Sequence, residues 1–404
     1  MTLKLILVSV DGTIGRNGKA DSEIVNQLAS FAAEMANHGV RIALWSSRRW
    51  NFDGKPLEEY LTQRSGVEVR GHGVLWDGSP ARPRKNSAIP ILQKYGVNRW
   101  ETLLLGSTDD DMRAGVSNKI LYVRANWYGQ QTTYGFEVRS VNELRRFCLV
   151  FALRQHLVFW GIDWPSASIR AAGPFSTMHA AYTTFGIDAK SAAKYGEGHP
   201  DFWFYLMVAS LYFSGQLEGV DYICSYPGHR SDADPPPAHG QESVLARLGR
   251  CFNMSYFHDL IIRHRTAAKS QNFKAHERKF STQLSSIHLN KNPTRNLTEP
   301  RRTPIKLAGK CVLVVDDIIT SGRSLESARA YLEAAGARVK LFGWLKTINS
   351  SYTAISQAPK LSPFRPNTIS TEPASTLYSY DEFVVDASAP GEINTALASY
   401  IAWK

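Results

Sequence analysis

The stretch that decides the fold is Cys311–Leu325, which reads CVLVVDDIITSGRSL. Its first five residues are apolar and mostly β-branched, and a small-polar turn then leads into a helical pattern that reads LESARAYLEAAG. This order predicts a buried strand, a tight turn and a helix. Open α/β sheets bind their ligands at the carboxyl ends of such strands. We therefore expect a binding site at the turn, residues 320–324.

Two adjacent carboxylates, Asp316 and Asp317, come just before this turn. Backbone N–H groups at a helix N-terminus, joined by the hydroxyls of Thr320, Ser321 and Ser324, form a cradle suited to one phosphate. Paired acids beside a phosphate are unusual unless the phosphate is carried on a polyol, whose vicinal hydroxyls can donate hydrogen bonds to both carboxylates. The pattern indicates a ligand such as a ribose 5-phosphate.

The 13 positions of Val312–Ser324 carry four apolar residues, two acids, two apolar residues and then T-S-G-R-S. This layout resembles the phosphoribosyl pyrophosphate (PRPP) motif of type I phosphoribosyltransferases. The resemblance implies that Asp316 and Asp317 are catalytic, with substrate-bound Mg²⁺ nearby. It also implies a 5-phosphate site formed by Thr320, Ser321, Gly322, Arg323 and Ser324. A Rossmann-type strand-to-helix turn with incidental acids is the alternative.

A second loop of the same domain follows the predicted strand Val220–Cys224. In a phosphoribosyltransferase, the loop after the first core strand holds pyrophosphate. Small residues let backbone amides approach the anion here, and a histidine and an arginine supply charge. We expect pyrophosphate to bind at Ser225, Tyr226, Pro227, Gly228, His229 and Arg230.

The segment that starts at Ile261 reads IIRHRTAAKSQNFKAHERKF. Its basic residues and glutamine resemble the loop that closes on PRPP in the competence-associated, ComF-like branch. That resemblance assigns catalytic roles to Arg263, Arg265, Lys269, Gln271 and Arg278, in a segment expected to be mobile until PRPP binds. A solvated basic helix face is the alternative. ComF-like proteins often add a four-cysteine zinc module, which this chain lacks, so the resemblance covers only about residues 220–348.

The N-terminal stretch Leu5–Ile14 reads LILVSVDGTI and resembles the D-x-D-G-T motif of the haloacid dehalogenase (HAD) superfamily. Ser9 stands where the nucleophilic aspartate is expected, and Asp11 matches the general acid and base. The other matching positions are Ser46, Lys85, Asp110 and Asp111. A serine hydroxyl lacks the charge that binds Mg²⁺, and no activating base is evident beside it. We therefore expect a degenerate domain without phosphatase activity; a site that binds phosphate without cleaving it stays an alternative.

The chain of 404 residues predicts an α/β protein with three regions. Residues 1–135 form a HAD-like Rossmannoid domain in which strands and helices alternate. Residues 136–219 form a helical, aromatic-rich linker or hood. Residues 220–404 form a type I phosphoribosyltransferase domain with a parallel sheet and an irregular segment at 349–376.

Composition limits the function classes further. Lysine and arginine number 47 against 36 acids, a net charge of +11 that attracts anionic ligands and leaves nucleic-acid binding open. No apolar run reaches 18 residues, so no transmembrane helix is expected. The four cysteines form no CxxC pair, so neither disulfides nor a structural zinc site is expected, and we expect a cytoplasmic protein.

These patterns predict an Mg²⁺-dependent, PRPP-binding phosphoribosyltransferase-like enzyme that acts on a base, nucleotide or nucleic-acid acceptor. The alternative is an effector or toxin of a phage-defence module that binds PRPP or a related nucleotide and is regulated by a nucleic-acid or protein partner. The intact acids and phosphate cradle favour the enzyme. The lost nucleophile of the first domain and the positive charge keep the effector open.

Overall fold

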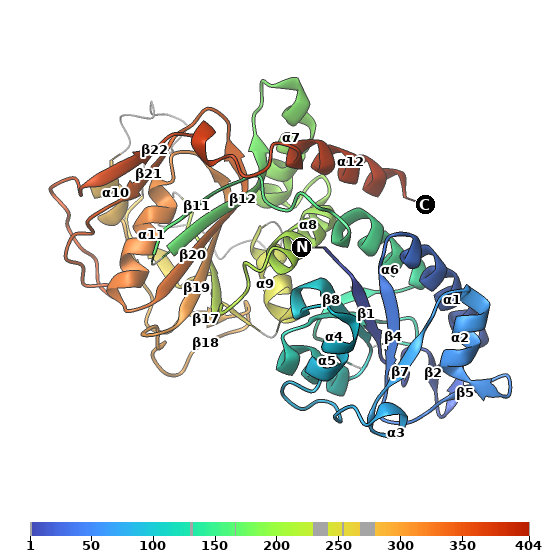
Figure 1. Ribbon diagram of the computed structural model, residues 1–404. Coiled ribbons are helices and arrows are strands. Elements are labelled where there is room, and N and C mark those ends of the chain that lie inside the picture. Colours follow the sequence, from blue (N-terminus) through green and yellow to red (C-terminus); the bar gives the residue numbers. More distant parts are fainter. Residues whose placement is uncertain are drawn as a thin grey trace.

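The computed structural model describes residues 2–129, 132–165, 167–228, 241–252, 254–266 and 279–403. Two six-stranded sheets dominate this described part of the chain. The N-terminal half (blue) and the C-terminal half (yellow to red) lie side by side, with the middle region (green) between them (Figure 1). The fold is α/β in both halves, as the sequence predicts.

The N-terminal sheet has the strand order β10-β9-β8-β1-β4-β7, and all neighbouring strands are parallel. Its strands are β1 (Leu5–Val8), β4 (Arg41–Trp45), β7 (Arg70–His72), β8 (Thr102–Gly106), β9 (Leu121–Ala125) and β10 (Phe136–Val138). Its helices are α1 (Ser22–Asn37), α2 (Leu57–Ser65), α3 (Val74–Asp77), α4 (Ile89–Tyr95) and α5 (Asp109–Asn118). Side chains alternate across β1, so that Leu5 and Leu7 pack with α4 and α5, whereas Ile6 and Val8 pack with α1. Because both faces are covered, β1 reads as an unbroken apolar run.

The C-terminal sheet has the order β11-β12-β20-β19-β13-β14, and only the β11–β12 pair is antiparallel among its described strands. Its strands are β11 (Trp160–Asp163), β12 (Ala167–Phe175), β13 (Tyr222–Ser225), β14 (Ser255–Tyr256), β19 (Cys311–Ile319) and β20 (Arg338–Thr347). The helices around it are α7 (Ala180–Tyr195), α8 (Pro200–Phe213), α9 (Gln241–Cys251), α10 (Phe280–Leu284), α11 (Arg323–Ala334) and α12 (Ala389–Ala402). Leu313 and Val315 share a core with α7 and α8, while Val312 and Val314 share a core with α11.

The middle region is helical over α6 (Val141–Phe147), the π-helical turn η2 (Cys148–Ala152), α7 and α8, but it also contributes β11 and β12 to the C-terminal sheet. The sequence did not indicate these strands, because β12 reads ASIRAAGPF and contains a single β-branched residue. The segment 349–376 also differs from the expected loop. Strand β21 (Tyr352–Ile355) pairs antiparallel with β22 (Ser375–Tyr378), so this segment includes most of a hairpin.

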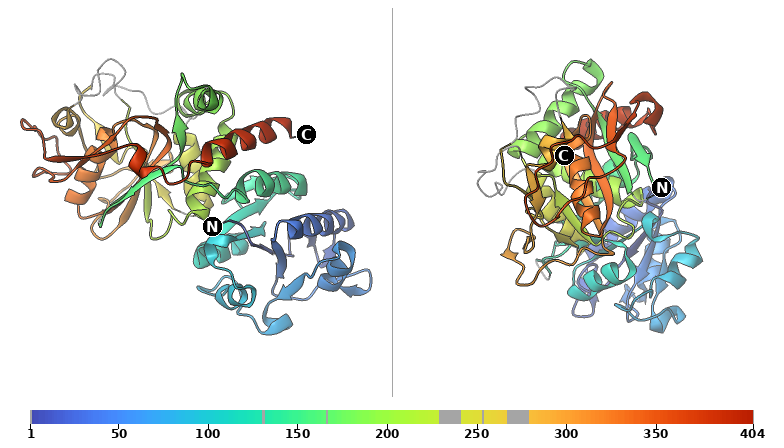
Figure 2. Two further views of the ribbon diagram at one scale, coloured as in Figure 1. Left: turned by 45° about the horizontal axis from the view of Figure 1, so that its top comes forward. Right: turned by 90° about the vertical axis from the view of Figure 1, so that its left-hand side faces the viewer.

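Short elements complete the described part: β2 (Gly15–Arg16), β3 (Lys19–Ala20), β5 (Asn51–Phe52), β6 (Lys55–Pro56), β15 (Ile261–Arg263), β16 (Ile287–Leu289), β17 (Thr294–Arg295), β18 (Glu299–Pro300), η1 (Arg99–Glu101) and η5 (Asp381–Phe383). The left view of Figure 2 shows α12 running from the C-terminal half across the middle region. Its Tyr400 ring lies 5.9 Å from that of Phe151, in η2. The end of the chain is thereby packed against the middle region.

Helix α8 joins the two halves. Its sequence, PDFWFYLMVASLYF, is apolar on every side and is buried accordingly. Trp203 stacks on Trp344 of the C-terminal sheet with ring centroids 5.8 Å apart, and the Tyr212 hydroxyl donates to the Thr102 carbonyl oxygen of the N-terminal sheet at 2.8 Å. One core therefore continues through both halves. Among the described residues, no helix combines the length and apolar character needed to cross a membrane.

Candidate active site

The paired acids lie where β19 extends past its neighbour β13. The β13 pairing ends at Ser225, opposite Val315, whereas β20 stays paired with β19 to the end of β19. Asp316 and Asp317 therefore line a stretch of β19 that runs beyond β13. The Asp317 N–H donates to Asp316 Oδ1 at 3.0 Å, and the Ile318 N–H donates to Asp317 Oδ1 at 2.8 Å. Each carboxylate is thus hydrogen-bonded to the N–H of the residue that follows it.

The electrostatics of this pair favour binding of a ligand that brings donors or positive charge. Burial raises the pKa of Asp316 well above its usual range, and the negative charge of Asp317 raises it further. The Nζ of Lys194, at the end of α7, lies 3.9 Å from Asp317 Oδ2, which is beyond hydrogen-bond distance. No sequence pattern pointed to Lys194. Hydroxyl donors or a cation placed here would stabilise the ionised form of both acids.

The turn after β19 presents backbone N–H groups. Gly322 is left-handed, with φ 81° and ψ −6°, and it precedes α11, which has no side-chain cap. A Cβ on Gly322 would meet the Tyr352 ring at 1.9 Å, so glycine is required for both space and conformation. The N–H groups of Ser321 and Gly322 have no acceptor within the described ranges. Such a turn at a helix N-terminus is a ready-made anion site.

Lys346 of β20 and Thr353 of β21 make hydrogen bonds to the backbone of this cradle. The Nζ of Lys346 donates to the carbonyl oxygens of Thr320 at 2.7 Å, of Thr347 at 3.2 Å and of Ser350. Lys346 is fully buried, and burial lowers its pKa to about 7. The Thr353 N–H donates to the Ser321 carbonyl oxygen at 3.0 Å. The lysine inside the apolar strand LFGWLKT was the sequence signal for this support, and it was missed.

The expected pyrophosphate loop lies beside the cradle and the acids. Tyr226, its second residue, donates a hydrogen bond from its hydroxyl to Gln283 Oε1 at 2.9 Å. Burial raises the pKa of Tyr226, the nearby Asp316 adds to this rise, and hydrogen bonds with Arg263 and Ser324 oppose it. The Tyr226 N–H donates to the Val315 carbonyl oxygen at 3.2 Å, so the loop starts beside the residue that precedes Asp316. The structure brings the loop 225–228, the acids and the cradle together.

Arg263 holds this loop from behind rather than from a lid. It lies in β15, only 6% exposed. Its guanidinium donates to the Gly228 carbonyl oxygen, to Ser286 Oγ at 2.7 Å and to the Tyr226 hydroxyl at 3.2 Å. The sequence predicts that Arg263 is mobile until PRPP binds. The structure places it in β15, which is paired with β16, and its donors are bound to protein acceptors.

The remaining predicted residues of this domain are placed less fully. Arg265 is exposed just beyond β15, and Pro227 is partly buried within the loop. Arg323 Nη1 donates to Ser321 Oγ at 3.1 Å, so one of its donors faces the cradle. Five predicted site residues lie outside the described residues: His229, Arg230, Lys269, Gln271 and Arg278.

The HAD-like positions gather at one edge of the N-terminal sheet. Ser9 follows β1, Ser46 follows β4, and the acidic cluster follows β8, and these three strands are neighbours. Ser9 Oγ and Ser107 Oγ are buried and have no hydrogen-bond partner in the described part of the chain. A serine without an adjacent base is a weak nucleophile. The predicted positions therefore lie at the ends of neighbouring strands, but Ser9 Oγ has no hydrogen-bonded base among the described residues.

The acids of this edge are neutralised or solvent-exposed. Asp11 Oδ2 lies 3.0 Å from Arg48 NH2. Asp111 is buried as the third residue of α5, where it caps the helix and accepts a hydrogen bond from Arg82 at 2.6 Å. The side chain of Asp110 is 71% exposed. Lys85 is exposed and makes no polar contact with the described residues, so Arg82, which the sequence interpretation overlooked, is the cation beside the acidic cluster.

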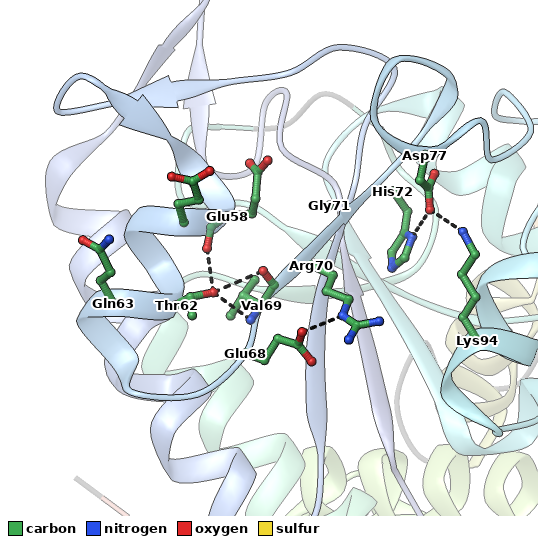
Figure 3. A pocket seen from close by; sticks show the side chains of 11 residues that line it. Glu58, Thr62, Gln63, Glu68, Val69, Arg70, Gly71, His72, Asp77 and Lys94 are labelled. Carbon is green, nitrogen blue, oxygen red and sulfur yellow. Dashed lines mark hydrogen bonds and ion pairs between the residues drawn. The ribbon is translucent and has the colours of Figure 1, made fainter.

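A hollow of ≈ 680 Å³ lies along β7, the edge strand next to β4 in the same sheet (Figure 3). Asp77 Oδ2 accepts from His72 Nδ1 and from Lys94 Nζ, both at 2.6 Å. Although burial raises the pKa of Asp77, the hydrogen bonds from Lys94, Ser79 and His72 lower it overall. Burial lowers the pKa of His72. His72 and Lys94 therefore compensate the charge of Asp77, whereas Glu58 Oε2, which also lines the hollow, is buried without a hydrogen-bond partner among the described residues.

Comparison with known families identifies a domain in the C-terminal half of the chain. The family model described as "Phosphoribosyl transferase domain" matches residues 265–345, which include β19, the cradle and most of β20. The chain therefore contains a phosphoribosyltransferase domain, as the motif predicts. No curated protein matches the sequence.

Comparison with solved structures finds weak likenesses. They include a cobalt-bound deoxy-D-mannose-octulosonate 8-phosphate phosphatase from Haemophilus influenzae (11% identity over 37% of this chain and 88% of that one, TM-score 0.26). A HAD-superfamily hydrolase from Geobacter sulfurreducens also matches (11% identity, 35% and 97% covered, TM-score 0.25). A third is a D,D-heptose 1,7-bisphosphate phosphatase from Burkholderia thailandensis (14% identity, 36% and 96% covered, TM-score 0.23).

Proposed function

We propose that the phosphoribosyltransferase domain of this chain binds PRPP together with Mg²⁺ and transfers the phosphoribosyl group to a base, a nucleotide or a nucleic acid. The observation that carries the proposal is the combination of Asp316 and Asp317 with an open anion cradle on one strand–turn–helix unit. Neither feature alone defines the substrate. Together they fit a phosphate and two vicinal hydroxyls on the same sugar.

In this proposal, each part of PRPP has its own set of residues. The 5-phosphate accepts hydrogen bonds from the N–H groups of Ser321 and Gly322, which have no acceptor among the described residues. The ribose hydroxyls donate to Asp316 and Asp317. Pyrophosphate binds along the loop 225–228, which Arg263 holds in place. The ribose hydroxyls thus supply hydrogen-bond donors to the carboxylates of Asp316 and Asp317.

The reaction breaks the bond between the anomeric carbon and the pyrophosphate oxygen. The bonding electron pair leaves with pyrophosphate, and the carbon passes through an oxocarbenium-like state. A lone pair of the acceptor then forms the new bond, and the acceptor releases its proton. The negative field of Asp316 and Asp317 favours the positive charge of the sugar in that state, and preorganised charge of this kind is worth roughly 3–4 kcal/mol per well-placed group.

The donor set also fits Mg²⁺. Carboxylate oxygens are the ligands that Mg²⁺ prefers, and Mg²⁺ commonly keeps several waters and substrate phosphates as its other ligands. When bound, Mg²⁺ would neutralise charge on pyrophosphate. Asp316 and Asp317 are the residues that would hold it, directly or through the sugar hydroxyls. The raised pKa of Asp316 fits a carboxylate whose negative charge is compensated only when a cation binds.

The acceptor is expected to approach from the side of the middle region. Helix α7 packs on the C-terminal sheet and carries Lys194 to within 3.9 Å of Asp317 Oδ2. This placement gives the region expected to act as a hood a direct border with the site. A single lysine at this border does not select one class of acceptor, so the proposal includes bases, nucleotides and nucleic acids. The N-terminal domain is proposed to have no part in phosphate ester hydrolysis, because Ser9 lacks an adjacent base.

The direct test is incubation of the full chain with PRPP and Mg²⁺ and a panel of bases, nucleotides and nucleic acids, with pyrophosphate release as the measurement. Release that depends on one acceptor class supports the transferase and identifies the acceptor. PRPP binding by calorimetry without release in any mixture would instead favour the non-catalytic effector. Absence of both binding and release would contradict the assignment of the site.

A further inference from the structure

Lys346 is the feature of this domain that the proposed chemistry does not use. Its side chain has no solvent exposure, and its Nζ lies 5.3 Å from the centre of the Trp160 ring and 5.5 Å from that of Tyr380. Its polar partners are three backbone carbonyl oxygens, and no carboxylate of the described residues pairs with it. A buried ammonium group without a counter-ion is unfavourable for folding. A methionine would fill the same apolar strand position without that penalty.

The contact with Thr320 has a geometric consequence for the cradle. The peptide bond between Thr320 and Ser321 is planar and trans, so its carbonyl and its N–H point in opposite directions. Lys346 Nζ pulls the Thr320 carbonyl into the core at 2.7 Å. The Ser321 N–H must then point away from the core. That is the direction required of a donor to a bound anion.

The next peptide is fixed in the same way from another strand. The Ser321 carbonyl oxygen accepts from the Thr353 N–H of β21 at 3.0 Å. Because this peptide is also trans, the Gly322 N–H points away from β21. The two successive N–H groups without acceptors are therefore oriented by contacts made behind them. Of the two contacts, the one from Lys346 also brings a positive charge.

We propose that Lys346 is a positioning residue for the phosphate cradle: its ammonium group fixes the Thr320 carbonyl so that the Ser321 N–H faces the 5-phosphate of the sugar. The proposal rests on the proposed function, since it assumes that the cradle binds a sugar phosphate. Lys346 does not touch the substrate and acts through the Thr320–Ser321 peptide. Its charge adds to the attraction for the anion from a side that water does not screen.

The same strand offers a matched control. Lys340 lies six residues earlier on β20, about 20 Å away by the rise of a strand. Its Nζ also donates to backbone carbonyl oxygens, those of Gln216 and Glu218, both at 2.9 Å. Lys340 therefore clamps carbonyls as Lys346 does, but at the end of the sheet away from the cradle. Lys340→Met reports what the loss of a carbonyl-clamping lysine does to the domain in general.

The test compares Lys346→Met with Lys340→Met in the full chain, using calorimetric binding of ribose 5-phosphate and, separately, of magnesium pyrophosphate. Loss of a charge-assisted hydrogen bond predicts about 10- to 100-fold weaker ribose 5-phosphate binding for Lys346→Met. Pyrophosphate binding should stay within about twofold, because it uses the loop after β13. Lys340→Met should change neither. Lys346→Gln keeps N–H donors without charge and should fall between the wild type and the methionine variant.

The outcomes separate the two proposals. Unchanged ribose 5-phosphate binding in Lys346→Met, or equal loss of both ligands, would overturn the positioning role while leaving the proposed function in place. A wild-type chain that binds neither ribose 5-phosphate nor PRPP would overturn the proposed function and this inference with it. If Lys346→Met does not fold by circular dichroism, Lys346→Gln decides by the same comparison: selective loss of ribose 5-phosphate affinity supports the role, and equal or absent loss overturns it.

Discussion

The two halves of this chain each place acids at the carboxyl ends of parallel strands, but they treat those acids differently. In the N-terminal half, Asp11 is paired with Arg48 at 3.0 Å, and Asp111 is bound by Arg82 and by the backbone of its own helix. In the C-terminal half, Asp316 and Asp317 accept backbone hydrogen bonds, and the nearest cation among the described residues is Lys194, 3.9 Å from Asp317 Oδ2. Burial raises the pKa of Asp316.

This difference separates acids that serve the fold from acids that await a ligand. A carboxylate with an arginine and two backbone donors has its charge compensated, so a ligand gains little by binding it. Two adjacent carboxylates that share a half-buried edge repel each other until donors or a cation arrive. Acids at similar positions on parallel sheets can therefore either stabilise the fold or bind a ligand, depending on the groups that surround them.

The strongest test of the comparison removes the charge of both C-terminal acids. Asp316→Asn with Asp317→Asn should reduce PRPP-dependent pyrophosphate release by at least about a hundredfold, because the groups that face the sugar cation and its hydroxyls are neutralised. Pyrophosphate release and calorimetric PRPP binding are the measurements. The matched control is Asp109→Asn with Asp110→Asn, an adjacent and exposed acid pair of the N-terminal half, which should leave both unchanged. Wild-type PRPP binding in the Asp316/Asp317 variant would contradict the assignment.

The sequence predicted the phosphoribosyltransferase domain because the parts of its motif are contiguous. The strand, both acids and the cradle lie within 13 positions, so local pattern alone brings them together. Lys194 and Arg82 could not be found in this way, because each reaches its acid only through tertiary packing. Arg263 donates to the Gly228 carbonyl oxygen of the predicted pyrophosphate loop, but its burial in a short paired strand depends on β16, a partner distant in sequence.

Strand assignment failed for a related reason. Strand β12 contains mainly alanine, glycine and serine, and its burial comes from neighbours β20 and β11 rather than from its own pattern. Strand β21 lies in a segment rich in serine, threonine and proline, where turn signals are stronger than strand signals. Local sequence indicates which residues can form a strand, but pairing with distant segments decides whether they do.

The second prediction concerns the shape of the cradle. Gly322→Ala should lower the free energy of unfolding by about 3 kcal/mol and weaken ribose 5-phosphate binding, because a Cβ would meet the Tyr352 ring at 1.9 Å in addition to the left-handed backbone strain. Gly309→Ala is the control, since Gly309 has φ +73° but no atom within 4 Å of an added Cβ. It should cost only about 1–2 kcal/mol. Equal destabilisation of the two variants in urea titrations would show that the Tyr352 contact is unimportant.

The third prediction sharpens the comparison from the N-terminal side. Arg82→Ala should lower the free energy of unfolding by about 3 kcal/mol, because it leaves the buried Asp111 without its cation. Arg48→Ala should cost at most about 1 kcal/mol, since Arg48 and Asp11 are both exposed. Chemical denaturation measures both. A larger loss of unfolding free energy for Arg48→Ala would mean that the ion pair of Arg48 and Asp11 stabilises the fold although both residues are exposed.

The fourth prediction follows from the raised pKa of Asp316. The native state binds this carboxyl proton more tightly than the unfolded state does, so the contribution of Asp316 to stability is most favourable below the unfolded pKa and is lost as pH rises through the folded pKa. Asp316→Asn should therefore be more stable than wild type at pH 8 and close to it at pH 3. Urea titrations at the two pH values measure this, with Asp381→Asn as an exposed control. A stability difference that does not depend on pH would show that the charge is already compensated.

The last prediction is that the N-terminal sheet has no phosphatase activity at the strand ends where Ser9 and Asp11 lie. Wild-type protein should not hydrolyse an aryl phosphate with Mg²⁺ above background, because Ser9 Oγ is buried without a base and Asp11 is held by Arg48. Asp11→Asn should then leave PRPP-dependent pyrophosphate release unchanged, since Asp11 lies on the other sheet. Both assays can be run on the same preparation. Aryl phosphate turnover that disappears in Asp11→Asn would show that this acid remains catalytic despite its ion pair. The acids of both halves would then be catalytic, and the two halves would differ in the substrate on which they act.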